Sequence, residues 1–158
     1  MTLGECVEQL ARLEEAVGAL YATFSARFAA SATAADFWRR LAHEEDNHAA
    51  RLRLAASGVA FPADEDAGAG ADPFGAGQAL RHLERLRSRA AVAPVSLEGA
   101  LALAYGVEHS LSERHLRIQP EAGPVGRVLE QLQALDAEHL ARLRAFAVAH
   151  GVFLPAEP

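Results

Sequence analysis

Apolar residues recur at alternating steps of three and four along four stretches of the chain, which is the spacing of an amphipathic helix. These stretches cover residues 3–28, 38–55, 97–118 and 129–146. Each is long enough to form several helical turns and to present one continuous apolar stripe. The pattern therefore predicts four long helices.

Capping and helix-breaking residues separate the four predicted helices. Residues 31–36 include short polar side chains that can cap the second helix, and Ser96 can cap the third. Gly58 and Gly151 are expected to end the second and fourth helices, and residues 120–124 to end the third. Because the links inside each pair are short, each pair is predicted to form an antiparallel hairpin.

The middle connection, residues 58–95, is much longer than the other two. Residues 62–77 are rich in Gly, Ala, Asp and Pro, whereas residues 78–90 predict a short amphipathic helix. A helix of about 22 residues is roughly 33 Å long, so only a connection of this size returns the chain to start the third helix parallel to the second. The prediction is an all-α four-helix bundle with one long crossover.

Composition agrees with one helical domain that spans residues 1–158. Of the 158 residues, 51% are apolar, and helix-forming residues outweigh the β-branched residues that strands favour. The expected parts are a first hairpin at 1–57, the crossover at 58–95 and a second hairpin at 96–151. The net charge of −6, with basic residues interspersed among apolar ones, predicts no nucleic-acid partner and no anionic membrane surface.

Cys6 is the only cysteine, which excludes an internal disulfide framework and a cysteine-based metal site. We expect it to be a small buried or half-buried residue. Glu5 and Glu8 stand where a signal peptide needs a basic start and an apolar run, and no stretch approaches the roughly 20 apolar residues of a membrane span. The protein is therefore expected to be soluble and cytoplasmic, without a membrane partner.

Each apolar stripe carries a carboxylate where a core residue belongs. On the second and fourth stripes a histidine follows three residues later, so carboxylate and imidazole share one helix face and can reach one metal ion. The two pairs lie 91 residues apart, and each is followed by Arg-Leu-Arg, which indicates an internal duplication. The six candidate metal ligands are Glu14, Glu45, His48, Glu108, Asp136 and His139.

The cost of burying these carboxylates favours a metal site. An ionised carboxylate in the protein interior costs several kcal/mol, and no Lys or Arg shares the stripes. Two divalent ions would neutralise the four acidic groups, while His48 and His139 would coordinate as neutral imidazoles. Oxygen-rich sites with one histidine per metal suit iron or manganese better than structural zinc.

The chain resembles the ferritin-like superfamily, and most closely its rubrerythrin-type branch without a rubredoxin domain. The resemblance rests on LEEAVGALYATF, FWRRLAHEEDNHAARL and SLEGALALAYGVEH, and it spans nearly the whole chain except the linker at 62–95. It implies a ferritin-like bundle that holds two Fe ions, with Mn as the alternative metal and Zn as a non-native occupant.

The resemblance also implies a role for each residue. Glu14 and Glu108 would be terminal ligands, Glu45 and Asp136 bridging ligands, and His48 and His139 would each cap one iron. Tyr21, seven residues after Glu14, would contact a ligand carboxylate and is the one candidate catalytic residue beyond the ligands. No organic cofactor is implied.

Three departures from the rubrerythrin pattern limit the likeness. Asp136 replaces the usual glutamate and is one methylene shorter, which predicts weaker binding of the second metal. The extra glutamate near the third-helix ligand is missing, because Tyr105 and Leu111 flank Glu108 at that spacing. No Cys-x-x-Cys iron–sulfur module is present, so electrons would arrive from an external donor protein or from ferrous iron itself.

The implied activity is oxidation of a diferrous centre by a small oxidant, H2O2 or O2, as in a peroxidase or ferroxidase that protects against oxidative stress or handles iron. The alternatives are an iron-binding or storage module without turnover, and a dimanganese catalase-like enzyme or di-iron hydroxylase. A homodimer is expected by analogy.

Several charged residues have a simpler interpretation. A single Glu-x-x-His on a helix is usually a solvated face, and the argument for metal depends on two copies in register. Glu15, Glu44 and Glu138 lie about 100° off the stripes and are expected to face solvent. His115 is on the third stripe, where we expect a structural or supporting role. The remaining histidines are expected at the surface or its boundary: His43, His82, His109 and His150.

Overall fold

The computed structural model describes the backbone of residues 3–57, 75–117 and 124–154, and the side chains of residues 4–57, 75–111 and 125–154. Within these ranges the chain forms helices and no strands, which confirms the all-α prediction there. The helices are α1 (Leu3–Arg27), α2 (Ala32–Ser57), α3 (Ala76–Val92), α4 (Leu97–Arg117) and α5 (Pro124–Ala149). The predictions for Gly58, for residues 62–74 and for the His115 side chain lie outside the described residues.

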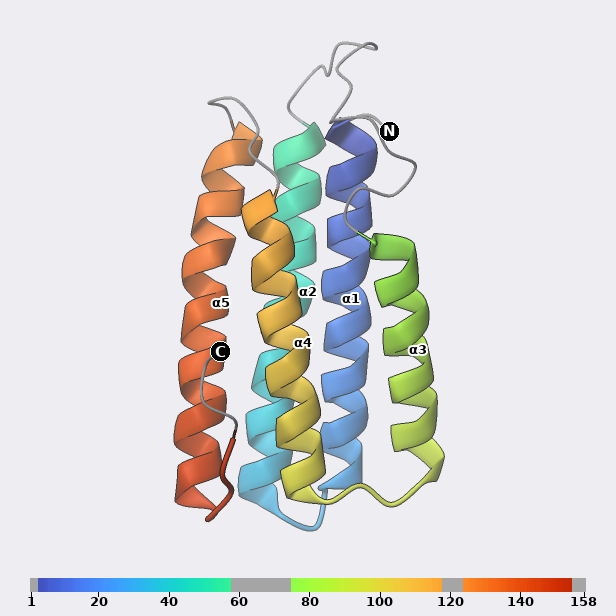
Figure 1. The fold of residues 1–158 in the computed structure, drawn as a ribbon, viewed down its shortest axis with the longest axis vertical. Helices are drawn as coiled ribbons and strands as arrows, with labels where there is room; N and C mark the ends of the chain where they lie inside the picture. The colour runs from blue at the N-terminus through green and yellow to red at the C-terminus, as the bar shows by residue number, and fades with distance from the viewer. Residues whose placement is uncertain (1–2, 58–74, 118–123, 155–158) are drawn as a thin grey trace.

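Four of the helices lie side by side along one axis, and α3 packs outside them against α1 (Figure 1). Helices α1 and α2 run in opposite directions, as do α4 and α5. Helix α4 runs parallel to α2, and α2 contacts α5 across the molecule. The long middle connection therefore returns the chain to the end of the molecule where α2 begins, with α3 as its helical part.

The predicted caps at Ser31, Ser96 and Gly151 are confirmed. The Ser31 hydroxyl accepts a hydrogen bond from the Ala34 backbone N–H at 3.4 Å, and the Ser96 hydroxyl accepts one from the Gly99 N–H at 3.0 Å. Gly151 has a φ of 71° just after α5, a left-handed conformation that suits glycine. Helix α4 ends at Arg117, and residues 118–123 lie outside the described residues. Pro124 begins α5, because proline is well accommodated in the first helical turn.

The predicted apolar stripes form the interior of the molecule. The largest fully buried side chains include Trp38 and Tyr21, whose rings lie 5.5 Å apart, and Phe24, whose ring lies 4.9 Å from Trp38. This aromatic cluster joins α1 to α2 through non-polar contacts. The stripes of α4 and α5 are mostly aliphatic, with Leu101 and Leu132 fully buried. The core therefore surrounds the middle of each long helix.

Two equivalent arginines connect the helices within each hairpin. Arg53, on α2, donates to Glu8 and Glu15 of α1, with 3.0 Å between Nε and the Glu8 carboxylate. Arg144, on α5, donates to the Tyr105 hydroxyl of α4. Both arginines end the duplicated Arg-Leu-Arg motif, so the same position of the repeat makes an inter-helix contact in each hairpin, to carboxylates in the first and to a phenol in the second.

Other described features agree with the expectations for single residues. Cys6 is buried, and burial raises the pKa of its thiol. His43, His82 and His150 are exposed and His109 is half-buried, as predicted. Over the part of the chain that the structure describes, no helix is both long and apolar enough to span a membrane.

Gly18 sets how closely α1 approaches α2. A Cβ atom at this position would lie 3.1 Å from the Ala42 carbonyl oxygen and 3.3 Å from the Glu45 Cβ, and both are held by the α2 backbone. We expect Gly18→Ala to destabilise the protein by about 1–3 kcal/mol through overpacking, despite the helix propensity of alanine. Urea unfolding measures the change in the free energy of unfolding.

Gly106→Ala is the matched control for Gly18→Ala. A Cβ at Gly106, in α4, meets nothing within 4 Å, so alanine there is expected to stabilise the helix by about 0.5–1 kcal/mol. Equal effects of the two substitutions would contradict the close approach at Gly18.

Candidate metal centre

The six predicted ligand residues are all buried in the middle of the molecule. Their exposed fractions are 3% or less, although charged side chains are rarely buried without a partner. They come from the four long helices, one or two from each. By helix, they are Glu14 on α1, Glu45 and His48 on α2, Glu108 on α4, and Asp136 and His139 on α5.

Five of the six residues form two overlapping groups, each able to hold a metal ion. One group contains Glu14, Glu45 and His48, and the other contains Glu45, Glu108 and His139. In each group the potential ligand atoms all lie within 4.8 Å of one another. Glu45 belongs to both groups, so its carboxylate lies between two candidate metal positions.

The two oxygens of Glu45 face different histidines. Oε2 lies 3.3 Å from Nδ1 of His48, and Oε1 lies 2.9 Å from Nδ1 of His139. The terminal glutamates complete each group, with Glu14 Oε2 3.7 Å from Nδ1 of His48 and Glu108 Oε2 3.4 Å from Nδ1 of His139. Each imidazole therefore faces one shared carboxylate and one carboxylate of its own.

The imidazoles of the two groups also lie close together. The rings of His48 and His139 are nearly parallel, with 20° between their planes and 5.2 Å between their centroids. This pairing joins α2 to α5, the two helices that carry the duplicated carboxylate-x-x-His pairs. The two half-sites thus form one continuous cluster.

Several ligand atoms in the cluster are buried without a hydrogen bond. They include Nδ1 of both histidines, Oε1 of Glu45 and Oε2 of Glu108. Nδ1 of His139 lies 2.9 Å from Oε1 of Glu45 and 3.4 Å from Oε2 of Glu108, and Nδ1 of His48 lies 3.3 Å from Oε2 of Glu45, but the directions do not suit hydrogen bonding. A buried polar atom without a partner is costly, and a cation placed among these lone pairs would satisfy them together. The donor set fits a metal ion.

Tyr21 supports the Glu108 carboxylate from α1. Its hydroxyl donates a hydrogen bond of 2.6 Å to Oε1 of Glu108, which leaves Oε2 directed toward His139. Burial and the neighbouring carboxylates raise the pKa of Tyr21 well above its usual value, so the phenol keeps its proton. The structure therefore places Tyr21 in contact with a candidate ligand.

Glu44 has a role that the stripe pattern missed. Its carboxylate is half-buried, lies 3.0 Å from Nε2 of His139 and accepts a second hydrogen bond from Arg142 at 2.9 Å. Burial alone would raise the pKa of the Glu44 carboxyl. Contacts with His139 and Arg142 outweigh burial and lower this pKa to about 2, so the carboxylate accepts the Nε2 proton. Burial lowers the pKa of His139, but contacts with Glu108, Glu44 and Glu45 outweigh burial and raise this pKa to about 12, so without a metal the ring is protonated. A bound metal would need the neutral ring, in which the Nε2 proton on Glu44 would leave the Nδ1 lone pair directed into the cluster.

Electrostatics inside the cluster depend on burial and on close carboxylates. Burial and the charge of Glu108 raise the pKa of Glu45 to about 8. Burial lowers the pKa of His48, but Glu14 and Glu45 outweigh it and raise the value to about 9. Without a metal, protons therefore partly neutralise the cluster. Coordination requires neutral imidazoles, so metal binding and proton release are coupled.

Asp136 is buried on α5, one helical turn before His139, but it belongs to neither of the two groups. Aspartate is one methylene shorter than the glutamate at the equivalent position, Glu45. Its bridging role therefore stays a prediction. Each group contains three residues, and Glu45 is the residue common to both.

A polar pocket of about 260 Å³ opens between α2 and α5 and contains both histidines in its lining. Asn47, Arg51 and Glu138 line it further out. Glu15 and Glu138 are exposed, as the stripe pattern predicted, and only Glu44 departs from that expectation. This α2–α5 pocket connects the surface to two candidate ligands.

Comparison with known proteins does not assign a family. No family model matches the chain, and searches of curated proteins and of solved structures found no match. The arguments for function therefore rest on the geometry of the cluster.

Removing the Glu44 carboxylate should weaken metal binding. In Glu44→Ala the Nε2 proton of His139 loses its acceptor, so the ring is no longer held with Nδ1 toward the cluster. We expect metal affinity to fall by about 10- to 100-fold. Competition titration with Zn²⁺, which stays in one redox state, measures the change.

Glu138→Ala serves as the control, because Glu138 lines the same pocket from α5 but is exposed. Its removal should leave Zn²⁺ affinity within about twofold of the parent, as expected for a solvated surface charge. A similar loss in both variants would show that general pocket charge, not the Glu44–His139 contact, controls affinity.

Proposed function

We propose that the protein is a rubrerythrin-like di-iron protein with a ferritin-like bundle, in which peroxide or dioxygen oxidises a diferrous centre. The observation that carries the proposal is the shared Glu45 carboxylate, whose two oxygens each face a different histidine. A carboxylate shared by two candidate metal positions would hold two metals close enough to act together on one oxidant.

The donor set supports iron. Each group offers carboxylate oxygens and one imidazole nitrogen, which suits iron or manganese, and it contains no thiolate. Two ferrous ions held by these residues would supply the two electrons that, with two protons, reduce H2O2 to two water molecules. An external donor protein would then restore the ferrous state.

The protein's own residues would hold the metals and control protons. Glu14 and His48 would bind one metal, Glu108 and His139 the other, and Glu45 would lie between them. Tyr21 orients Glu108 and carries a proton beside the cluster. The α2–α5 pocket, which reaches both histidines, gives a small polar oxidant a route to the centre.

The iron content per chain and the amount of peroxide consumed test the proposal. Protein purified from cells grown with iron should contain two Fe per chain by elemental analysis. Its near-ultraviolet absorption should change when peroxide is added after reduction, with about one peroxide consumed per two irons. Iron that stays bound while peroxide is not consumed would instead favour a storage module.

Glu45→Ala should reduce the iron content to one ion or fewer, because both groups lose their shared carboxylate. Asp46→Ala is the matched control, since Asp46 is the adjacent exposed residue on α2 and belongs to neither group. Full iron content in Glu45→Ala would overturn the two-metal assignment.

Unequal metal affinities are expected because Asp136 is shorter than a glutamate. Stepwise titration with Mn²⁺ should show a first ion that binds at least about tenfold more tightly than the second. Asp136→Glu should narrow this difference by bringing the carboxylate one methylene closer. Two equal affinities in the parent protein would contradict a role for side-chain length at this position.

A further inference from the structure

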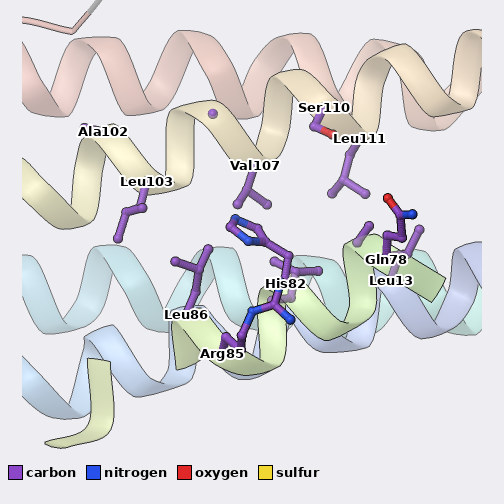
Figure 2. Close-up of a pocket in the computed structure, with 13 residues that line it drawn as sticks. Leu13, Gln78, His82, Arg85, Leu86, Ala102, Leu103, Val107, Ser110 and Leu111 are labelled. Atoms are coloured by element: carbon purple, nitrogen blue, oxygen red, sulfur yellow. The ribbon is translucent and has the colours of Figure 1, made fainter. Parts of the chain in front are cut away.

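A second pocket lies on the opposite side of the molecule, between α3 and α4 (Figure 2). It encloses about 570 Å³, which is within the range of small-molecule sites in proteins. Leu13 of α1, Leu83 and Leu86 of α3, and Val107 and Leu111 of α4 contribute apolar side chains to its wall. We call this space the α3–α4 pocket.

Small residues create the α3–α4 pocket. Ala79 on α3 and Ala102 and Gly106 on α4 are among the lining residues, and none of them has a side chain beyond Cβ. A Cβ added at Gly106 meets nothing within 4 Å. The two helices therefore leave an apolar space that larger residues at these positions would close.

The charge of the pocket lining is opposite to that of the whole chain. The chain has a net charge of −6, but the residues that line the pocket include Arg85 and His82 and no aspartate or glutamate. Both project from α3, and the His82 ring extends toward Val107 of α4 (Figure 2). No described residue forms a hydrogen bond or ion pair with the Arg85 guanidinium. Gln78 and Ser110 add polar groups at the pocket rim.

We propose that the α3–α4 pocket binds a small monocarboxylic acid with an apolar body. The aliphatic wall would bury the apolar body, and the carboxylate would meet Arg85 and His82. None of the residues that line this pocket belongs to the candidate metal centre. The inference therefore goes beyond the proposed function and does not depend on metal.

Decanoate is a suitable probe, because it combines one carboxylate with a flexible apolar chain. Isothermal titration calorimetry of the full-length protein, below the micelle-forming concentration of decanoate, should show saturable binding of one molecule per chain. Decanol should bind more weakly because it lacks the charge. The absence of saturable decanoate binding would overturn the proposal, as would equal binding of decanol.

Two variants place the probe in the α3–α4 pocket. Gly106→Phe fills the space and should abolish decanoate binding, whereas Gly106→Ala should retain most of it. Arg85→Gln should weaken decanoate binding about threefold to tenfold and leave decanol unchanged. Arg81→Gln is the matched control, since Arg81 is exposed on the same helix and does not line the pocket.

Further outcomes test whether decanoate binds in the α3–α4 pocket. Undiminished decanoate binding to Gly106→Phe, with the helical content of the parent retained, would overturn the proposed location. If Gly106→Phe does not fold, the decanoate affinities of Arg85→Gln and Arg81→Gln are compared instead. Equal decanoate affinities in these two variants would overturn the proposal. A change of oligomeric state in Gly106→Phe, without decanoate binding to the parent, would instead assign the pocket to a second copy of the chain.

Discussion

Negative charge buried at the centre of the molecule is the constraint on which the rest of the structure depends. Four carboxylates are shielded from water at the middle of the four long helices, and two imidazoles are buried beside them. Protonated imidazoles supply two positive charges at most, and the raised pKa of Glu45 shows the cost of the remaining charge. Two divalent cations would balance four carboxylates and leave both imidazoles neutral. Charge balance therefore favours a pair of metals over protons alone.

Contacts between the surrounding helices hold the candidate metal ligands in fixed positions. Gly18 lets α1 approach α2 beside Glu45, so the first half-site is assembled from two closely spaced helices. Arg53 and Arg144 connect the helices of each hairpin at equivalent points of the duplication. Tyr21 and Glu44 then orient one ligand each, Glu108 and His139. The geometry of the cluster thus depends on contacts outside it as much as on the ligands.

Periodicity predicted the buried residues well because burial follows from which face of a helix meets the core. Glu14 and Glu108 could be selected among the glutamates of their helices, because no other glutamate there interrupts the apolar stripe. Glu44 was missed because the stripe pattern treats any residue about 100° away as solvent-facing, whereas its long side chain reaches a ligand on α5. The α3–α4 pocket was missed for a related reason. Periodicity says which face is apolar, but it does not say whether small residues such as Gly106 leave space unfilled.

The two faces of the bundle differ although the sequence is duplicated. Helices α2 and α5 carry the histidines, and the pocket between them is lined by charged residues such as Arg51 and Glu138. Helices α1 and α4 carry the single glutamates, and α3 covers this side through its contact with α1. Only one hairpin is followed by a long connection, so the extra helix breaks the approximate symmetry on one side alone. The α3–α4 pocket therefore lies on the side that has the extra helix, whereas the polar pocket that reaches two candidate ligands lies between α2 and α5.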